Sequence, residues 1–134
     1  MRLAFLTLAF TATFTSVAIT HHSFAASYFE EQSVTIEGSV VEFAFRSPHA
    51  WVYVDVTDAN GKVTRYGAEW ANPNRLTRDG ITSGSLRSGD RVTITGSPGR
   101  KASENQIHLK RIERPADGWQ WRGGRSGGRN GGRR

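Results

Sequence analysis

Two adjacent histidines, His21 and His22, directly follow an apolar leader, and nitrogen donors at the start of a chain can bind a metal ion. If the leader is cleaved after Thr20, the mature chain begins with His21, whose free α-amine and imidazole form a chelate. Nitrogen donors in tetragonal geometry suit Cu(II). His49 is a candidate third donor, because the loop between the first two expected strands can lie near the start of the first strand. The pattern predicts a metal site made of His21, His22 and His49, with copper as the candidate cofactor.

This site depends on where the leader is cut. Cleavage one residue earlier would place His22 third in the chain, an arrangement that also favours copper through the α-amine and backbone amides. Cleavage after Ala25, behind Ser23 and Phe24, would remove both histidines. The pair also fits an exposed chain end without a ligand, because termini are commonly disordered unless they are tied down.

The other two histidines lie within the expected barrel. His49 follows Pro48, and its alternative role is that of a loop histidine whose ring bonds a backbone carbonyl. His108 lies on the opposite strand face from Ile107 and Leu109, so we expect a solvated side chain there. The sequence thus favours His49 over His108 as a ligand.

A second candidate site is aromatic and consists of Trp51, Tyr53, Tyr66 and Trp70 on two neighbouring expected strands. The second and third strands of an OB barrel form its usual binding surface. Exposed rings there can stack on bases or sugar rings, at roughly 1–3 kcal/mol per stacked base. The alternative is that these rings cover the barrel ends or a neighbouring strand. Asp55 follows Trp51 and Tyr53 on the same strand face, which indicates that this face is partly wet.

Catalytic patterns are weak in this chain. Glu30 and Glu31 are adjacent and would point apart on a strand, so they are poor partners for general acid and base chemistry. The sequence has no nucleophile elbow, phosphate-binding glycine loop or paired-histidine zinc motif. It also has no cysteine, which excludes disulfides, thiolate nucleophiles and cysteine-ligated zinc. These features favour a binding or accessory module of uncharacterised role over an enzyme, without excluding catalysis.

The leader indicates the compartment. Arg2 precedes an apolar stretch at residues 3–14, LAFLTLAFTATF, and small and polar residues follow it. This order is typical of a secretory signal peptide. A membrane anchor would need about 20 largely apolar residues, and threonines interrupt this stretch. We therefore expect a signal peptide at residues 1–20, a periplasmic or secreted mature chain, and no transmembrane segment in that mature chain.

Basic residues are concentrated at the end of the chain. The sequence has 18 lysines and arginines and 12 acidic residues, for a formal net charge of +6. Five of the arginines lie in residues 122–134, RGGRSGGRNGGRR, and Arg2 belongs to the leader, so 12 basic residues remain to balance the 12 acidic ones. A Gly/Arg segment buries too little apolar surface to fold, and we expect a disordered tail.

The tail could bind a polyanion through Arg122, Arg125, Arg129, Arg133 and Arg134. An exported protein meets little nucleic acid, so an anionic cell-envelope surface or an exported partner protein is the expected partner. Each arginine near an anionic surface contributes on the order of 1 kcal/mol. The same composition also fits a solubilising tail. Trp119 and Trp121, just before it, are candidates for an interfacial anchor or for packing on the barrel.

Alternating apolar residues indicate the strands that must position these groups. In residues 34–45 the alternation changes phase after Val40, close to Gly38, which predicts a bulged and bent first strand. Four further strands are expected within residues 50–56, 63–70, 86–96 and 105–112. Asn72, Pro73 and Gly80 predict one short helix between the third and fourth strands. This order predicts an all-β fold, a small five-stranded OB-like Greek-key barrel that forms one domain over residues 21–121.

Four stretches together resemble a known family: HHSFAA after the leader, then SPHAWVYVDVTDANGKV, EWANPNRLTRDGI and SLRSGDRVTITG. They are similar to the bacterial exported proteins grouped as domain of unknown function 6152, over about residues 21–113. The resemblance implies export and a compact β-rich domain, and it implies no activity. The Gly/Arg tail departs from the family pattern.

Overall fold

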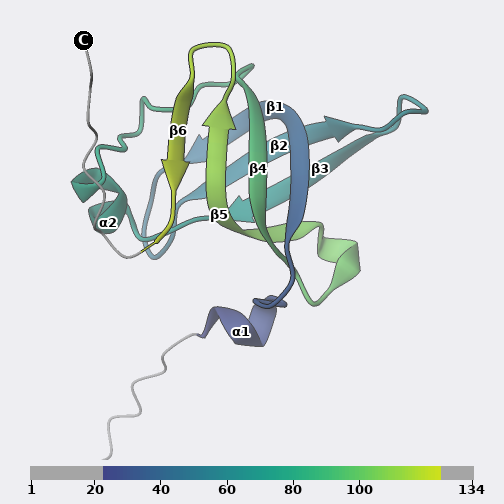
Figure 1. The fold of residues 1–134 in the computed structure, drawn as a ribbon, viewed down its shortest axis with the longest axis horizontal. Coiled ribbons are helices and arrows are strands. Elements are labelled where there is room, and N and C mark those ends of the chain that lie inside the picture. Colours follow the sequence, from purple (N-terminus) through teal and green to yellow (C-terminus); the bar gives the residue numbers. More distant parts are fainter. Residues whose placement is uncertain (1–22, 125–134) are drawn as a thin grey trace, which may run out of the picture.

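The computed structural model describes residues 23–124 and has six strands and three short helices (Figure 1). In chain order these are α1 (Phe24–Ser27), β1 (Val34–Ala44), β2 (Trp51–Thr57), β3 (Val63–Glu69), α2 (Pro73–Arg78), β4 (Arg91–Pro98), the 3-10 helix η1 (Ala102–Glu104), β5 (Gln106–Arg114) and β6 (Trp119–Arg122).

The strands form one sheet in the order β3-β2-β1-β4-β5-β6, and all neighbours in that order are antiparallel. An additional parallel pairing of β3 with β5 closes the first five strands into a barrel. The predicted all-β OB-like barrel is confirmed. β6 was not predicted, and it extends the sheet beyond β5 where the sequence suggested only the approach to a tail.

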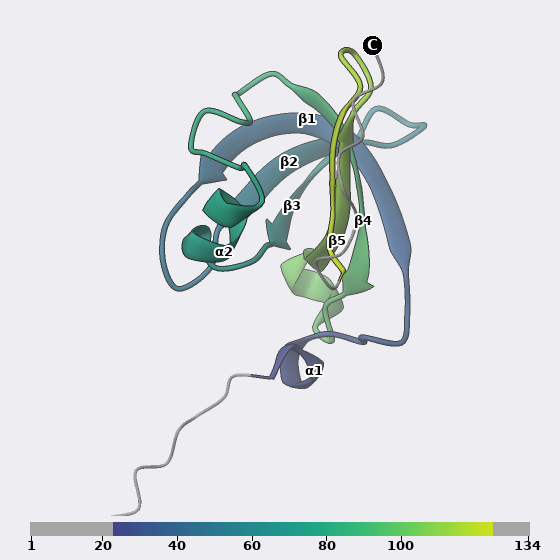
Figure 2. The same cartoon turned by 60° about the vertical axis from the view of Figure 1, so that its left-hand side comes forward.

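The first strand bends across the barrel so that it belongs to both halves of the sheet (Figure 2). Its first part pairs with β4 from Val34 to Ser39, and its second part pairs with β2 from Ser39 to Ala44. The predicted bulge is present between Val40 and Glu42. A Cβ at Gly38 would lie 2.4 Å from the Asp55 backbone oxygen, so the bend requires glycine there.

The helix between β3 and β4 begins and ends as the sequence predicted. The Asn72 side chain accepts a hydrogen bond from the Asn74 backbone N–H at 2.8 Å, Pro73 is the first helical residue, and Gly80 follows with φ +83°. Leu76 is fully buried and anchors α2 on the core. The inward residues of the strands complete this core: Val40, Val52, Val54, Ala68, Val92, Ile94, Ile107, Leu109 and Ile112.

β6 closes the core beside α2. The Trp121 ring packs edge-on against Trp70, with centroids 5.1 Å apart, and its Nε1–H donates to Asp79 at 3.0 Å. Trp121 therefore packs on the barrel, one of the two roles that the sequence left open.

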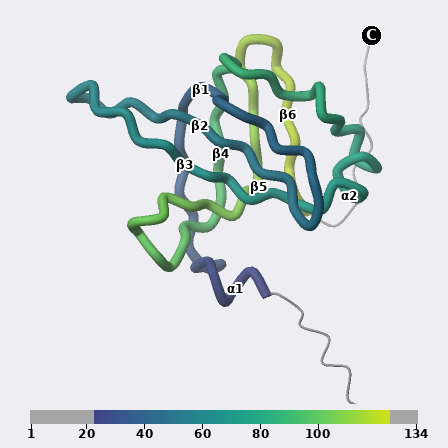
Figure 3. The backbone as a smooth tube through the Cα atoms, turned by 180° about the vertical axis from the view of Figure 1, so that it is seen from behind, coloured from purple at the N-terminus to yellow at the C-terminus, as the bar shows by residue number. Residues whose placement is uncertain are grey.

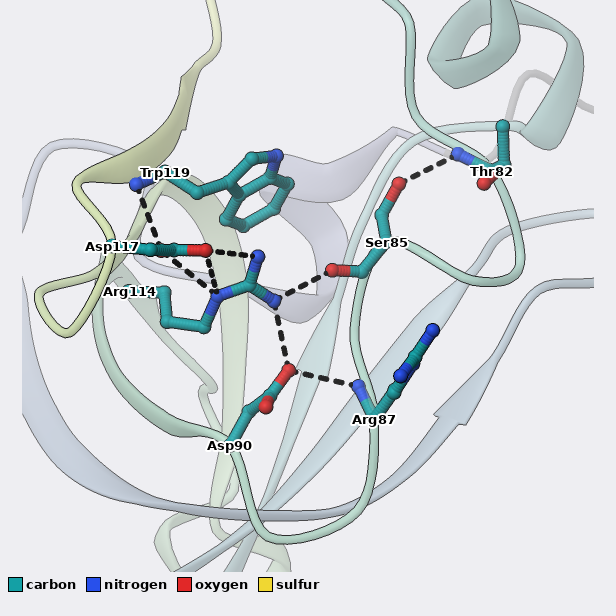
Figure 4. Close-up of polar contacts among 7 residues, drawn as sticks. All are labelled: Thr82, Ser85, Arg87, Asp90, Arg114, Asp117 and Trp119. Atoms are coloured by element: carbon teal, nitrogen blue, oxygen red, sulfur yellow. Dashed lines mark hydrogen bonds and ion pairs between the residues drawn. The ribbon is translucent and has the colours of Figure 1, made fainter.

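One arginine joins the β5–β6 hairpin to the segment between α2 and β4 (Figure 4). The Arg114 guanidinium donates to the Ser85 carbonyl and to Asp90 at 2.8 Å each, and to both oxygens of Asp117. Its guanidinium also lies over the Trp119 ring, 5.2 Å from the centroid. The cluster is saturated by internal contacts, which indicates a structural clamp.

Arg114→Ala should lower the free energy of unfolding by about 2 kcal/mol, because Asp90 and the Ser85 carbonyl then lose a charged donor. Arg91→Ala is the matched control, since Arg91 pairs with Glu37 at side-chain exposures of 60% and 61%, against 19% for Arg114. The control should change stability by less than about 1 kcal/mol. Urea unfolding measures both, and equal shifts would contradict a clamp at Arg114.

Candidate functional site at the barrel seam

The parallel pairing of β3 with β5 places two ionisable residues side by side on the outside of the barrel. Glu69, the last residue of β3, is in register with His108 of β5. Ala68, Ile107 and Leu109 beside them point into the core. Glu69 and His108 therefore face outward at the seam where the barrel closes.

The segment before β1 covers this seam. Arg100, in the β4–β5 connection, holds it by donating from its backbone N–H to the Ser27 carbonyl and from Nε to the Ala25 carbonyl, each at 2.9 Å. Tyr28 forms a β-bridge with Gly99 and is almost fully buried. α1 consequently lies at the same end of the barrel as the β4–β5 connection (Figure 3).

Phe24 in α1 contacts both histidines of the described chain. Its ring stacks on His108 with centroids 3.7 Å apart and an interplanar angle of 8°. Its centroid also lies 5.1 Å from that of His49, which precedes β2. The start of the described chain thus joins the β1–β2 loop to β5.

Each histidine is held by a carboxylate. His49 Nδ1 lies 2.7 Å from Glu69 Oε1, and Tyr28 donates its hydroxyl to Glu69 Oε2 at 2.5 Å. Burial and the hydrogen bond to Glu69 raise the pKa of the Tyr28 hydroxyl, so it remains a donor at neutral pH. His108 Nδ1 lies 2.7 Å from Glu30 Oε1, and Lys110 Nζ donates to Glu30 Oε2 at 2.5 Å. The two arrangements, which we call the seam pairs, have the same form: histidine, carboxylate and a further donor.

The charges of the second seam pair follow from its surroundings. Burial alone would raise the pKa of Glu30, but the hydrogen bonds from Lys110 and His108 outweigh it and lower that pKa. Burial lowers the pKa of His108, and the hydrogen bond to Glu30 only partly opposes this. At neutral pH an ionised Glu30 therefore faces a neutral His108.

This arrangement determines which imidazole nitrogen is available. In the second seam pair the ionised Glu30 carboxylate only accepts hydrogen bonds, so Nδ1 of the neutral His108 ring donates the proton and Nε2 has the lone pair. Within residues 23–124, no hydrogen bond involves Nε2 of His49 or His108. A neutral imidazole held by a carboxylate at its other nitrogen is the usual arrangement of a metal-binding histidine. No group of three or more metal-ligating side chains occurs in the described part of the chain, so a metal ion there needs further donors.

Comparison with protein families identifies the family of this chain. The model described as a family of unknown function, DUF6152, matches residues 9–108. The chain belongs to this family. The resemblance inferred from the four sequence stretches is thereby confirmed, and the family description names no activity.

Comparison with curated proteins gives no significant match. Among solved structures, the chain is similar to the crystal structure of the ZRD-deleted mutant of TiaS in complex with agmatine, with 21% identity and a TM-score of 0.46. The match covers 62% of this chain and 21% of that one, so the chain spans about a fifth of that protein's length. A likeness this weak supports no conclusion about ligands.

The predicted metal site is only partly described. His49 belongs to the first seam pair, and its ring bonds the Glu69 carboxylate instead of a backbone carbonyl. His21 and His22 lie outside the described residues. The expectation that His108 is a solvated side chain was wrong, because its side chain is only 13% exposed. Phe24 and Glu30 cover it, and Glu30 is 78 positions away in the sequence, so no local pattern could have shown the contact.

The four predicted aromatic residues do not share one surface. Trp51 and Tyr53 lie on the outer face of β2, with rings 6.1 Å apart and nearly parallel, at 11°. A Cβ at Gly67 would lie 3.3–3.4 Å from these rings, so they cover that glycine. Trp70 has no exposed surface and belongs to the core, and Tyr66 packs against the core. The predicted binding face is corrected to Trp51 and Tyr53 alone.

The predicted polyanion site also lies mostly beyond the described chain. Arg122 ends β6 with an exposed side chain, and Arg125, Arg129, Arg133 and Arg134 lie outside the described residues. In residues 23–124, no helix has both the length and the apolar character required to cross a membrane.

Proposed function

We propose that this family member is an exported, non-catalytic binding or accessory protein whose ligand is Cu(II), bound at its mature N-terminus with help from His49. The observation that supports this most directly is the contact between the rings of Phe24 and His49, with centroids 5.1 Å apart. Phe24 is three residues after His21. Because three residues span at most about 11 Å, we propose that a donor at His21 can reach the ion beside His49.

The packing of the start of the chain also favours one cleavage position in this proposal. A cut after Ala25 would remove Phe24, and with it the ring that packs on His49 and His108. It would also disturb the bond from Arg100 to the Ala25 carbonyl. A cut after Thr20 preserves these contacts and leaves the His21 amine as a donor.

A Cu(II) titration of protein recovered from its export compartment tests this proposal, with intact mass on the same sample to show that His21 is the first residue. We expect one tight site, lost in His21→Ala and weakened about 10-fold or more in His49→Ala, because each change removes a nitrogen donor. An extension of Gly-Ser-Gly-Ser before His21 is the matched control, since it preserves every imidazole but displaces the α-amine. It should also weaken binding. Absence of tight binding with His21 confirmed would overturn the proposal.

A second candidate function is binding of flat rings at Trp51 and Tyr53. The supporting observation is their nearly parallel stack over Gly67 on the β2–β3 face, where OB barrels commonly bind oligonucleotides or oligosaccharides. Asp55 and Arg65 follow on the same face and form a two-point ion pair, at 2.8 and 3.0 Å, which adds polar groups beside the rings.

Trp51→Ala should weaken binding of a cell-envelope oligosaccharide or a single-stranded oligonucleotide by roughly 5- to 150-fold, the equivalent of 1–3 kcal/mol for one lost ring stack. Trp51→Phe should preserve much of the affinity, and Val63→Ala, at an exposed β3 residue, should preserve all of it. Isothermal titration against both ligand types measures this. If neither type binds the wild-type protein, the stack serves only to pack β2 on β3.

A third candidate, polyanion binding by the tail, rests on its five arginines. The best truncation ends at Gly124, because Arg122 pairs with Arg111 in the sheet and the Gly123 N–H donates to the Lys110 carbonyl. This truncation should abolish most binding to vesicles with anionic lipids, and binding of the full chain should fall steeply with salt. Equal vesicle co-sedimentation of the two proteins would reject a role for the tail.

A further inference from the structure

We propose that residues 24–30, which we call the strap, form a pH-sensitive cover that closes over the barrel seam at neutral pH and is released in acid by protonation of His108. The strap consists of α1 and the three residues that follow it, up to Glu30. This inference goes beyond the proposed function and needs no metal ion, because every group in it lies within residues 23–124.

Backbone hydrogen bonds attach the strap to the end of β4 and the residues after it. The Phe29 N–H donates to the Pro98 carbonyl, and the Arg100 N–H donates to the Ser27 carbonyl, at 2.9 Å each. Backbone amides do not titrate in this range, so any response of the strap to pH must come from its side-chain contacts. Release of the strap breaks both bonds, which makes the amides of Phe29 and Arg100 reporters of release.

Side chains fasten both ends of the strap to β5. At its start, the Phe24 ring stacks on His108, with centroids 3.7 Å apart. At its end, Glu30 Oε1 lies 2.7 Å from His108 Nδ1, and Glu30 Oε2 accepts a hydrogen bond from Lys110 Nζ at 2.5 Å. One imidazole therefore contacts both ends of the strap, and the strap leaves that side chain 13% exposed.

The groups that face His108 determine how it responds to a proton. Burial, the largest effect, disfavours the imidazolium, and so does Lys110 of β5, whereas Glu30 of the strap and Glu69 of β3 favour it. The Tyr28 ring lies 5.5 Å away between centroids, and its hydroxyl is neutral at neutral pH because burial raises its pKa. The net result is a lowered pKa for His108. The closed strap thus keeps the imidazole that it covers in its neutral form.

The direction of the pH effect follows from this lowered pKa. Release of the strap exposes His108 to water, and its pKa then returns towards the ordinary value of about 6.5. Above that value the imidazole is neutral in both forms, and the closed strap has its full stability. As the pH falls through the lowered pKa of the closed form, the released form binds the proton more readily, so the equilibrium moves towards release.

Glu30 acts in the same direction in stronger acid. Burial raises its pKa, but the hydrogen bonds from Lys110 and His108 outweigh burial and lower that pKa in the closed form. The stability that Glu30 contributes is therefore present above the ordinary value of about 4.3 and is lost below it. His108 consequently responds first as the pH falls from neutral, and Glu30 responds after it.

Release of the strap does not require the barrel to unfold. The pairings that build and close the sheet join β1 to β6 and do not include residues 24–30. The strap has its own isolated bridge, between Tyr28 and Gly99, outside those strands. Segments outside the main pairings open at a lower free energy than core strands do. The strap can therefore respond to pH on its own.

Amide hydrogen exchange of the metal-free protein, corrected for the intrinsic rate at each pH, measures this release. We expect protection of the Phe29 and Arg100 amides to fall at least about 2-fold between about pH 8 and about pH 5, because the released form takes up a proton in that range. Val54, which is fully buried in β2, provides the internal control, and protection of its amide should not change.

His108→Phe is the matched variant, because phenylalanine preserves a flat ring against Phe24 and cannot be protonated. The fall in protection between about pH 8 and about pH 5 should disappear in this variant. Glu30→Gln is the second variant, and it leaves His108 able to titrate. Its strap should be less protected at neutral pH, because the ion pair with Lys110 is lost, and the fall in protection should persist.

A measurement on the wild-type protein guards against misfolding of the variants. In a nuclear magnetic resonance titration, the ring signals of Phe24 and Tyr28 should change with the same midpoint as the His108 imidazole, below about pH 6.5. Different midpoints would contradict the inference. So would strap protection that is constant with pH, equal losses at the strap and at Val54, or an unchanged pH response in His108→Phe. The copper proposal would stand in each case.

Discussion

The parallel pairing of β3 with β5 is the contact on which both the barrel and its candidate site depend. It joins only three residue pairs, yet it closes the sheet and sets Glu69 beside His108. Closure also requires β4 to approach β5 closely, and a Cβ at Gly96 would lie 2.1 Å from the His108 carbonyl oxygen. A side chain at Gly96 would push the strand that bears His108 away from the seam. The fold and the seam pairs are therefore products of the same closure.

Much of the fold could be predicted from short-range pattern. The phase change after Val40 revealed the bulge in β1, and Asn72, Pro73 and Gly80 marked α2, because caps and bulges are written in a few neighbouring residues. β6 escaped prediction because it is four residues long and its identity as a strand comes from pairing with β5. The alternation that identifies longer strands is too brief to be read in WQWR.

The candidate site was less predictable because its contacts join distant parts of the chain. His108 meets Glu30 across 78 positions, and Tyr28 meets Glu69 across 41. The face pattern correctly placed His108 away from the core, but it could not show that the segment before β1 returns to cover that face. Trp70 illustrates the same limit, since it follows the last residue of β3 and only the fold shows that it turns inward onto Trp121.

The barrel is covered in two places, by α2 with β6 and by the segment before β1. The two coverings differ in the kind of side chain that makes the contacts. Where α2 and β6 cover the core, the contacts are mainly apolar, through Leu76 and Trp121. Where the segment before β1 covers the seam, it places partly buried ionisable groups against one another in the two seam pairs. Desolvating charged groups costs free energy that a hydrophobic contact avoids, so covering the seam alone would not require them. Their alignment saturates both carboxylates and fixes the orientation of both imidazoles, which a covering by hydrophobic contacts would not do.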